Sequence, residues 1–230
     1  SPTMVACPFL TGLMARAVAG SRLTPLTAMN VLLILCVGGM LTGSANAVRE
    51  LVKERVIYQR ERAVGLPRSA YLVSKVVVLG AITVAQAVVL TLVGLLGVDL
   101  NAPGGKGVLM PPLPEIALAV ALLAFTAMLL GLLVSALVPK EDVTMPLLVL
   151  LTVVQVTFCG PWCGCTASPA GPADLARASR WALGAMAGTV ELARIVPSDL
   201  TSDPLFRHSA EVWLRNLAVL LVLAGAFGFA

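Results

Sequence analysis

The stretch IALAVALLAFTAMLLGLLVSALVP, residues 116–139, runs for 24 residues without a charged side chain. A helix of roughly 20 apolar residues crosses the hydrocarbon core of a bilayer, and it satisfies every backbone N–H and C=O group there without water. Two further uncharged stretches, residues 23–48 and 76–98, have the same character. The sequence therefore predicts an all-α, polytopic membrane helix bundle.

The composition excludes several classes of soluble protein. Of the 230 residues, 58% are hydrophobic and 12% are charged, and the mean hydropathy is +0.94. Soluble domains contain about 45–50% apolar and about 25% charged residues. A disordered chain, a disulfide-stapled mini-domain and a soluble Rossmann or barrel enzyme are excluded. The net charge of +4 does not indicate a nucleic-acid partner, because the basic excess lies in one short segment between apolar stretches.

Five complete or nearly complete membrane spans are expected after the end of a truncated first helix at residues 1–18. The expected spans are residues 23–48, 70–98, 115–138, 143–160 and 213–230. Between them, segment 49–69 (RELVKERVIYQRERAVGLPRS) carries six Lys and Arg residues. Short cytoplasmic loops are enriched in these residues, so we place this segment in the cytoplasm and the long loop 161–212 outside.

Residues 49–64 are predicted to form an amphipathic helix, because Val and Ala recur near one face and charges lie opposite. Gly65 followed by Pro67 is a helix-stop signal. One interpretation is a basic helix lying on anionic lipid headgroups. The other is a helix that transmits force to a soluble cytoplasmic partner, since Glu residues among the basic ones favour recognition of a protein.

The pattern E-R…E-R-x-x-G-L…S-A-Y-x-x-x-K in this region resembles the coupling helix and following span of ABC-2 type permeases. It is similar in particular to G-subfamily-like ATP-binding-cassette exporters and to bacterial half-transporters with forkhead-associated domains. The matching residues are Glu54, Arg55, Glu61, Arg62, Gly65, Leu66, Ser69, Ala70, Tyr71 and Lys75. The string SRWALGAMAGTVEL, residues 179–192, also looks like a family motif. Residues 159–177 depart from the family pattern. We interpret them either as a divergent outer loop or as a reading-frame artefact.

The resemblance implies a type V exporter-like membrane domain that works as a homodimer in the lipid of the plasma membrane. An ATPase domain, in the same polypeptide or a separate subunit, would supply the energy. The residues expected to couple to it are Glu54, Arg55, Arg60, Glu61, Arg62 and Gly65. The second and fifth helices of the family face the central path, so Asn30, Thr152 and Gln155 are expected to line the path of a lipid-like or amphipathic substrate.

This chain contains no G-x-x-x-x-G-K-[ST] motif, so ATP and Mg²⁺ are expected on the ATPase domain and no cofactor on this chain. The spans hold no ionisable residue near their middle, which argues against a proton- or ion-coupled carrier. Other polar residues within the spans are interpreted first as groups that form hydrogen bonds between helices. They include Ser44, Asn46, Gln86, Thr91 and Thr126.

No catalytic or metal site is predicted. Cys159, Cys163 and Cys165 lack a second pair of metal ligands, and the only histidine, His208, is distant in sequence. A disulfide among these three cysteines is an alternative to free thiols. A rival interpretation of the whole chain is a non-transporting membrane scaffold, whose basic loop recruits a cytoplasmic partner or anionic lipid.

Overall fold

The computed structural model describes residues 2–20, 24–61, 68–98, 100, 107–137, 146, 149–150, 152–153, 178–192 and 204–229. In this part of the chain the regular structure is helical, and no β-strand occurs. The all-α fold predicted from the apolar stretches is confirmed.

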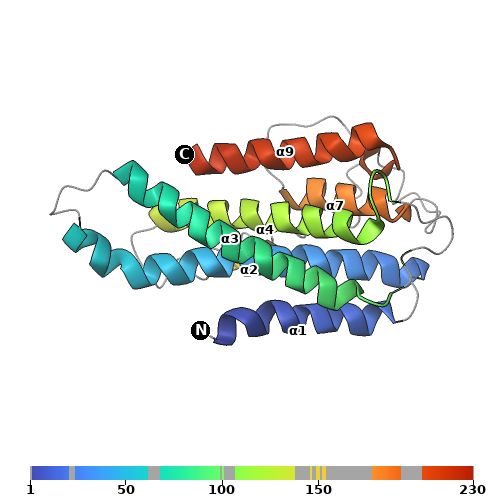
Figure 1. Ribbon diagram of the computed structural model, residues 1–230, viewed down its shortest axis with the longest axis horizontal. Helices are drawn as coiled ribbons and strands as arrows, with labels where there is room; N and C mark the ends of the chain where they lie inside the picture. The colour runs from blue at the N-terminus through green and yellow to red at the C-terminus, as the bar shows by residue number, and fades with distance from the viewer. Residues whose placement is uncertain are drawn as a thin grey trace.

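The described elements form an elongated bundle whose long helices follow the long axis (Figure 1). They are α1 (Pro2–Ala19), α2 (Pro25–Glu61), α3 (Arg68–Leu95), α4 (Pro112–Leu137), α7 (Ala178–Thr189), the 3-10 helix η3 (Pro204–Phe206) and α9 (Ala210–Phe229). We call the end where α2 ends and α3 begins the inner end. The outer end holds the start of α2, the end of α3, η3 and the starts of α4 and α9.

Local sequence signals explain where α1 ends and where α2 begins. The Gly20 N–H donates to the Arg16 carbonyl at 3.1 Å, and Gly20 has a φ of 62°, which is the left-handed conformation common after a helix. Thr24 and Thr27 cap α2 reciprocally, because each backbone N–H donates to the other hydroxyl, at 2.9 and 3.4 Å. Pro25 then occupies the first helical position, which favours proline.

Four helical stretches are long and apolar enough to cross a membrane. They are Thr27–Ala47, Val73–Leu95, Pro112–Ala136 and Ala210–Gly228. They overlap the spans expected at 23–48, 70–98, 115–138 and 213–230. A shorter apolar helix, Ala6–Ala19, lies where the end of a first helix is expected. The remaining expected span, 143–160, falls mostly outside the described residues.

Helices α2 and α4 approach each other so closely that glycine is required between them. A Cβ atom added to Gly43 would lie 2.1 Å from the Ala124 carbonyl oxygen, and one added to Gly131 would lie 2.9 Å from the Ala47 Cβ. Small residues at such positions allow helix backbones to make direct van der Waals contact in a membrane. Two of the apolar spans are therefore joined over several turns.

The expected outer loop 161–212 contains a buried helix. Ten of the 12 residues of α7 are buried, and this helix packs against α2, α4 and α9. Gly184 permits the approach of α9, because a Cβ there would lie 3.0 Å from Asn216 Nδ2. The description of this segment as a loop was thus incomplete, since small residues let α7 enter the outer end of the bundle.

Contacts after α7 hold its end in place. His208 Nδ1 lies 2.8 Å from the Gly188 carbonyl oxygen, and His208 Nε2 lies 3.6 Å from a Glu191 carboxylate oxygen. The Asn216 amide donates to the Leu205 carbonyl at 3.3 Å. These contacts join α7, η3 and α9 into one unit. They indicate that His208 has a structural role.

Candidate functional site

Helix α2 continues without a break from its apolar span into the charged segment. The span Thr27–Ala47 is followed in the same helix by residues 48–61. At 1.5 Å per residue, these residues add about 21 Å beyond the span. Figure 1 shows this extension at the inner end, beside the start of α3. Up to Glu61, the segment expected as a coupling helix is therefore an unbroken continuation of α2.

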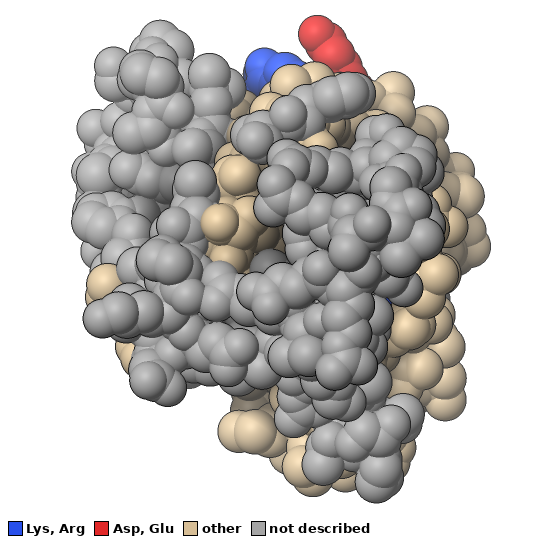
Figure 2. All heavy atoms as spheres, turned by 90° about the vertical axis from the view of Figure 1, so that its left-hand side faces the viewer, with Lys and Arg blue, Asp and Glu red and all other residues tan. Residues whose placement is uncertain are grey.

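Four of the six predicted coupling residues lie on the described extension. These are Glu54, Arg55, Arg60 and Glu61, and their backbone is helical. Glu54 and Glu61 are seven residues apart, so two helical turns place them on nearly the same side. Arg62 and Gly65 lie outside the described residues, as does the helix end expected at Gly65. In Figure 2, which faces the inner end, the residues drawn in colour are almost all uncharged.

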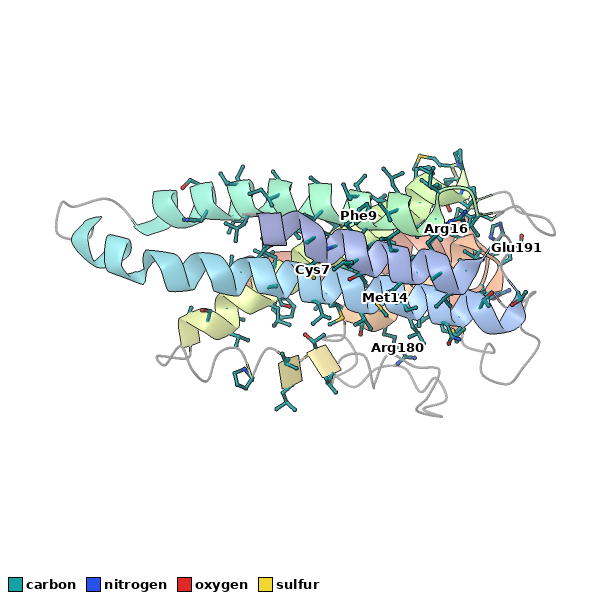
Figure 3. All side chains as sticks on the ribbon, turned by 90° about the horizontal axis from the view of Figure 1, so that it is seen from below. Cys7, Phe9, Met14, Arg16, Arg180 and Glu191 are labelled. Carbon is teal, nitrogen blue, oxygen red and sulfur yellow. The ribbon has the colours of Figure 1, made fainter. Side chains whose placement is uncertain are left out.

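The three residues predicted to line a translocation path occupy different surroundings. Asn30 is exposed in the second turn of α2, near the outer end. Thr152 is 7% exposed and lies in a short helical stretch that Figure 3 draws on the side of the bundle opposite α3. Gln155 lies outside the described residues. A shared path along these residues stays a prediction.

A buried polar cluster links α2 and α3 toward the inner end. The Asn46 amide donates to Thr83 Oγ1 at 3.0 Å and also to Gln86 Oε1. All three side chains are less than a tenth exposed. Buried amides need such partners, because an unpaired polar group in an apolar environment is costly. The interpretation of Asn46 and Gln86 as groups that join helices is confirmed, whereas Thr83 was missed.

Three other polar residues in the spans bond to their own helices. The hydroxyls of Ser44, Thr91 and Thr126 each donate to the carbonyl four residues earlier, at 2.7, 2.9 and 2.8 Å. Ser and Thr commonly satisfy themselves in this way inside helices. The bonds that these hydroxyls donate therefore stay within one helix, because a short hydroxyl reaches its own preceding turn first, and a link between helices through these residues stays a prediction.

Sequence reasoning also missed Glu115, in the first turn of α4. Its side chain is fully buried, with 0% exposure. The carboxylate accepts hydrogen bonds from the backbone N–H groups of Val108, Leu109 and Met110, at 3.0, 2.6 and 2.7 Å. An acidic residue directly before a long apolar run was the available signal, since acids favour helix N-termini. That signal did not indicate that the partners of Glu115 would be the backbone N–H groups of residues 108–110.

The described residues hold no group of three or more His, Cys, Asp or Glu that could bind a metal ion. Cys7 is an exposed free thiol, and Cys36 is buried. Figure 3 shows Cys7, Phe9 and Met14 along α1, while Arg16 and Glu191 lie at the outer end. Cys159, Cys163 and Cys165, for which a disulfide was considered, lie outside the described residues.

Comparison with known proteins identifies the family of this bundle. A family model described as the membrane domain of ABC-2 type transporters matches residues 2–161, which include α1 to α4 and more than half of the chain. This chain belongs to the ABC-2 type transporter family. The resemblance stated for the charged segment is thereby confirmed, and the fold is that of a transporter permease domain.

A similar protein of Mycobacterium tuberculosis is named ABC transporter ATP-binding/permease protein Rv1747. It is 34% identical to the ABC-2 domain described above over 196 residues. The match covers 84% of this chain and 22% of that protein. This chain therefore spans about a fifth of the length of that relative.

Proposed function

We propose that this ABC-2 domain is the permease part of an ATP-driven exporter in the plasma membrane. An ABC ATPase in the same full-length polypeptide would supply the energy and hold ATP and Mg²⁺. The name of the Mycobacterium tuberculosis relative, which combines ATP binding and a permease, supports this arrangement. Two copies would form the transport path between them, and lipid would surround the remaining apolar faces.

The observation that carries this proposal is the continuity of α2. Its charged extension, residues 48–61, belongs to the same helix as the apolar span Thr27–Ala47. The span is in turn packed against the α4 backbone at Gly43 and Ala124. A displacement applied to the extension would therefore move α2 and α4 inside the bundle. A helix that only lay on lipid headgroups would not need this stiff connection.

The substrate we propose is lipid-like or amphipathic. The stretches 23–48, 76–98 and 116–139 contain no charged residue, so the bundle offers apolar surface with a few amides and hydroxyls. Sites of this character suit apolar molecules with a small polar group. An ionic substrate without an apolar part would lose its hydration along such surfaces without compensation.

The test uses the full-length protein in liposomes that contain a fluorescent phospholipid. Movement of this lipid between leaflets is followed by its accessibility to dithionite, with and without ATP. The Glu54→Lys/Glu61→Lys double variant is expected to lose most ATP-dependent movement while its membrane insertion is unchanged. Glu211→Lys is the matched control, because Glu211 is exposed at the start of α9 at the outer end. ATP-dependent movement at the unsubstituted rate in the double variant would refute the coupling role.

The same preparation distinguishes the rival scaffold function. A scaffold predicts no ATP-dependent lipid movement and no stimulation of ATP hydrolysis by lipid. The exporter predicts both in the unsubstituted protein. Basic segments that only bind anionic lipid would instead show salt-dependent attachment that is indifferent to ATP.

A further inference from the structure

Glu115 is a buried acid in the first turn of α4, at the outer end, that the proposed function does not yet use. Its side chain has 0% exposure, and no salt bridge to Lys or Arg is found for it among the described residues. Burying a charge is costly unless hydrogen bonds replace the lost water. The contacts of Glu115 must therefore explain why an acid occupies this position.

The turn 107–110 wraps around the Glu115 carboxylate. Oε1 accepts the N–H groups of Leu109 and Met110, and Oε2 accepts the N–H of Val108. Gly107 allows this closeness, because a Cβ there would lie 1.9 Å from the Met110 carbonyl oxygen and 3.1 Å from Oε2. Bonds to an ionised acceptor are about twice as strong as neutral ones. The turn is therefore attached to α4 through one side chain.

The same carboxylate lies next to α7. Thr189, the last residue of α7, lies beside Glu115, and its hydroxyl donates to the Ala185 carbonyl of its own helix at 3.1 Å. Helix α4 also packs along α7 and α9. Glu115 thus lies where the outer turn, the start of α4 and the end of α7 meet.

Helix α4 connects this junction to the inner end. It contacts the α2 backbone at Ala124, opposite Gly43, and again near Gly131. If α2 moves α4 through these central contacts, the first turn of α4 moves as well. Any motion of α4 therefore reaches the outer surface at Glu115.

We propose that Glu115 is a positioning residue through which α4 moves the outer turn 107–110 and the end of α7 during the transport cycle. This inference rests on the proposed function, because it assumes that ATP drives α2. Glu115 does not touch substrate in this role. It holds the outer turn so that the turn follows α4 instead of remaining still.

The experiment uses the full-length protein with its native cysteines replaced and Leu109→Cys as a reporter. Leu109 is 55% exposed, and its bond to Glu115 uses the backbone, so the substitution preserves that bond. The labelling rate by a membrane-impermeant thiol reagent is measured with and without ATP and vanadate. The protein with Glu115 is expected to show a labelling rate that changes on nucleotide trapping.

Glu115→Gln is expected to abolish this change while ATP hydrolysis continues. The amide has one acceptor oxygen in place of two, and its NH₂ group faces backbone N–H donors. Lipid movement should fall about tenfold, because the variant loses one of the hydrogen bonds that hold the outer turn to α4. Glu211→Gln is the control, because Glu211 lies in the first turn of α9 but is exposed.

A purely structural role would lower ATP hydrolysis and transport together in the folded variant, and that result overturns the inference. So does an ATP-dependent labelling change in Glu115→Gln equal to that of the unsubstituted protein. If Glu115→Gln does not fold, Glu115→Asp is measured in its place. Its shorter carboxylate should give a smaller labelling change, and a full change overturns the inference. Absence of ATP-dependent transport in the unsubstituted protein would instead refute the proposed function itself.

Discussion

At the scale of single residues, Gly43 sets the separation of α2 and α4. Gly43→Ala would place a methyl group 2.1 Å from the Ala124 carbonyl oxygen, a backbone atom that cannot rotate away. We expect the helices to be forced apart, at a cost of about 1–3 kcal/mol. The measurement is the thermal unfolding midpoint of the purified full-length protein.

Gly225→Ala provides the matched control for this substitution. Gly225 lies within α9, and in the described part of the chain its added Cβ would meet no heavy atom within 4 Å beyond its own neighbouring helix backbone. Alanine favours helix over glycine by about 1 kcal/mol, so this variant should be unchanged or slightly stabilised. An equal decrease of the unfolding midpoint in the two variants would show that close packing at Gly43 does not cause the destabilisation.

The bond between Asn46 and Thr83 makes a second prediction at this scale. A double-mutant cycle of Asn46→Ala and Thr83→Ala should give a coupling energy of about 0.6–1.7 kcal/mol, as found for polar contacts between membrane helices. The cycle is measured by denaturation in mixed micelles. Asn46→Ala combined with Thr91→Val is the control, because Thr91 bonds to its own helix, at the Ala87 carbonyl. The idea fails if both cycles give the same coupling.

At the scale of elements, the important property of α2 is its unbroken length. Its 37 residues correspond to about 55 Å of helix, well beyond the roughly 30 Å of a bilayer core. Charge marks where the helix leaves the lipid, but backbone hydrogen bonds continue past that point. The proposed function therefore depends on the stiffness of α2 between the span and the extension.

Two insertions after Ala47 test this stiffness. Four alanines and four glycines add the same length and the same rotation to α2, but each glycine weakens a helix by about 1 kcal/mol relative to alanine. We expect the glycine insertion to lose ATP-dependent lipid movement and the alanine insertion to retain more of it, while both still hydrolyse ATP. Indistinguishable transport rates would contradict a rigid connection.

At the scale of the whole molecule, the bundle separates a basic inner end from an outer end with the turn 107–110. Residues 49–69 carry six Lys and Arg residues, which favours the cytoplasm for the inner end. Helix α2 runs from one end to the other and α3 returns (Figure 1), so labels at the two ends should report opposite sides of the membrane.

Single cysteines in the full-length protein, with its native cysteines replaced, test this orientation. A membrane-impermeant maleimide should label Leu109→Cys on intact cells, and should label Tyr58→Cys only after the cells are permeabilised. Leu109 is exposed in the outer turn, and Tyr58 lies on the α2 extension. Labelling of Tyr58→Cys on intact cells would place the charged segment outside and would contradict ATP coupling from the cytoplasm.

The spans were predictable because crossing a bilayer depends on the length and hydropathy of one continuous stretch of sequence. A run such as 116–139 must be helical when it has no water to satisfy its backbone. The motif around Glu54 and Glu61 indicated the family for a different reason, since its residue types and spacing are read directly along the chain. The contacts of Asn46 and Glu115 were not predictable, because any amide or acid in these helices has several faces and several neighbours available.

The sequence by itself determined that this chain is an all-helical membrane domain of the ABC-2 type, because hydropathy and a local charged motif need no knowledge of neighbours. The tertiary structure alone decided that α7 is buried, that α4 joins α2 at Gly43, and that Glu115 holds the outer turn. These features depend on which helix faces meet, and packing over long sequence separations sets those faces.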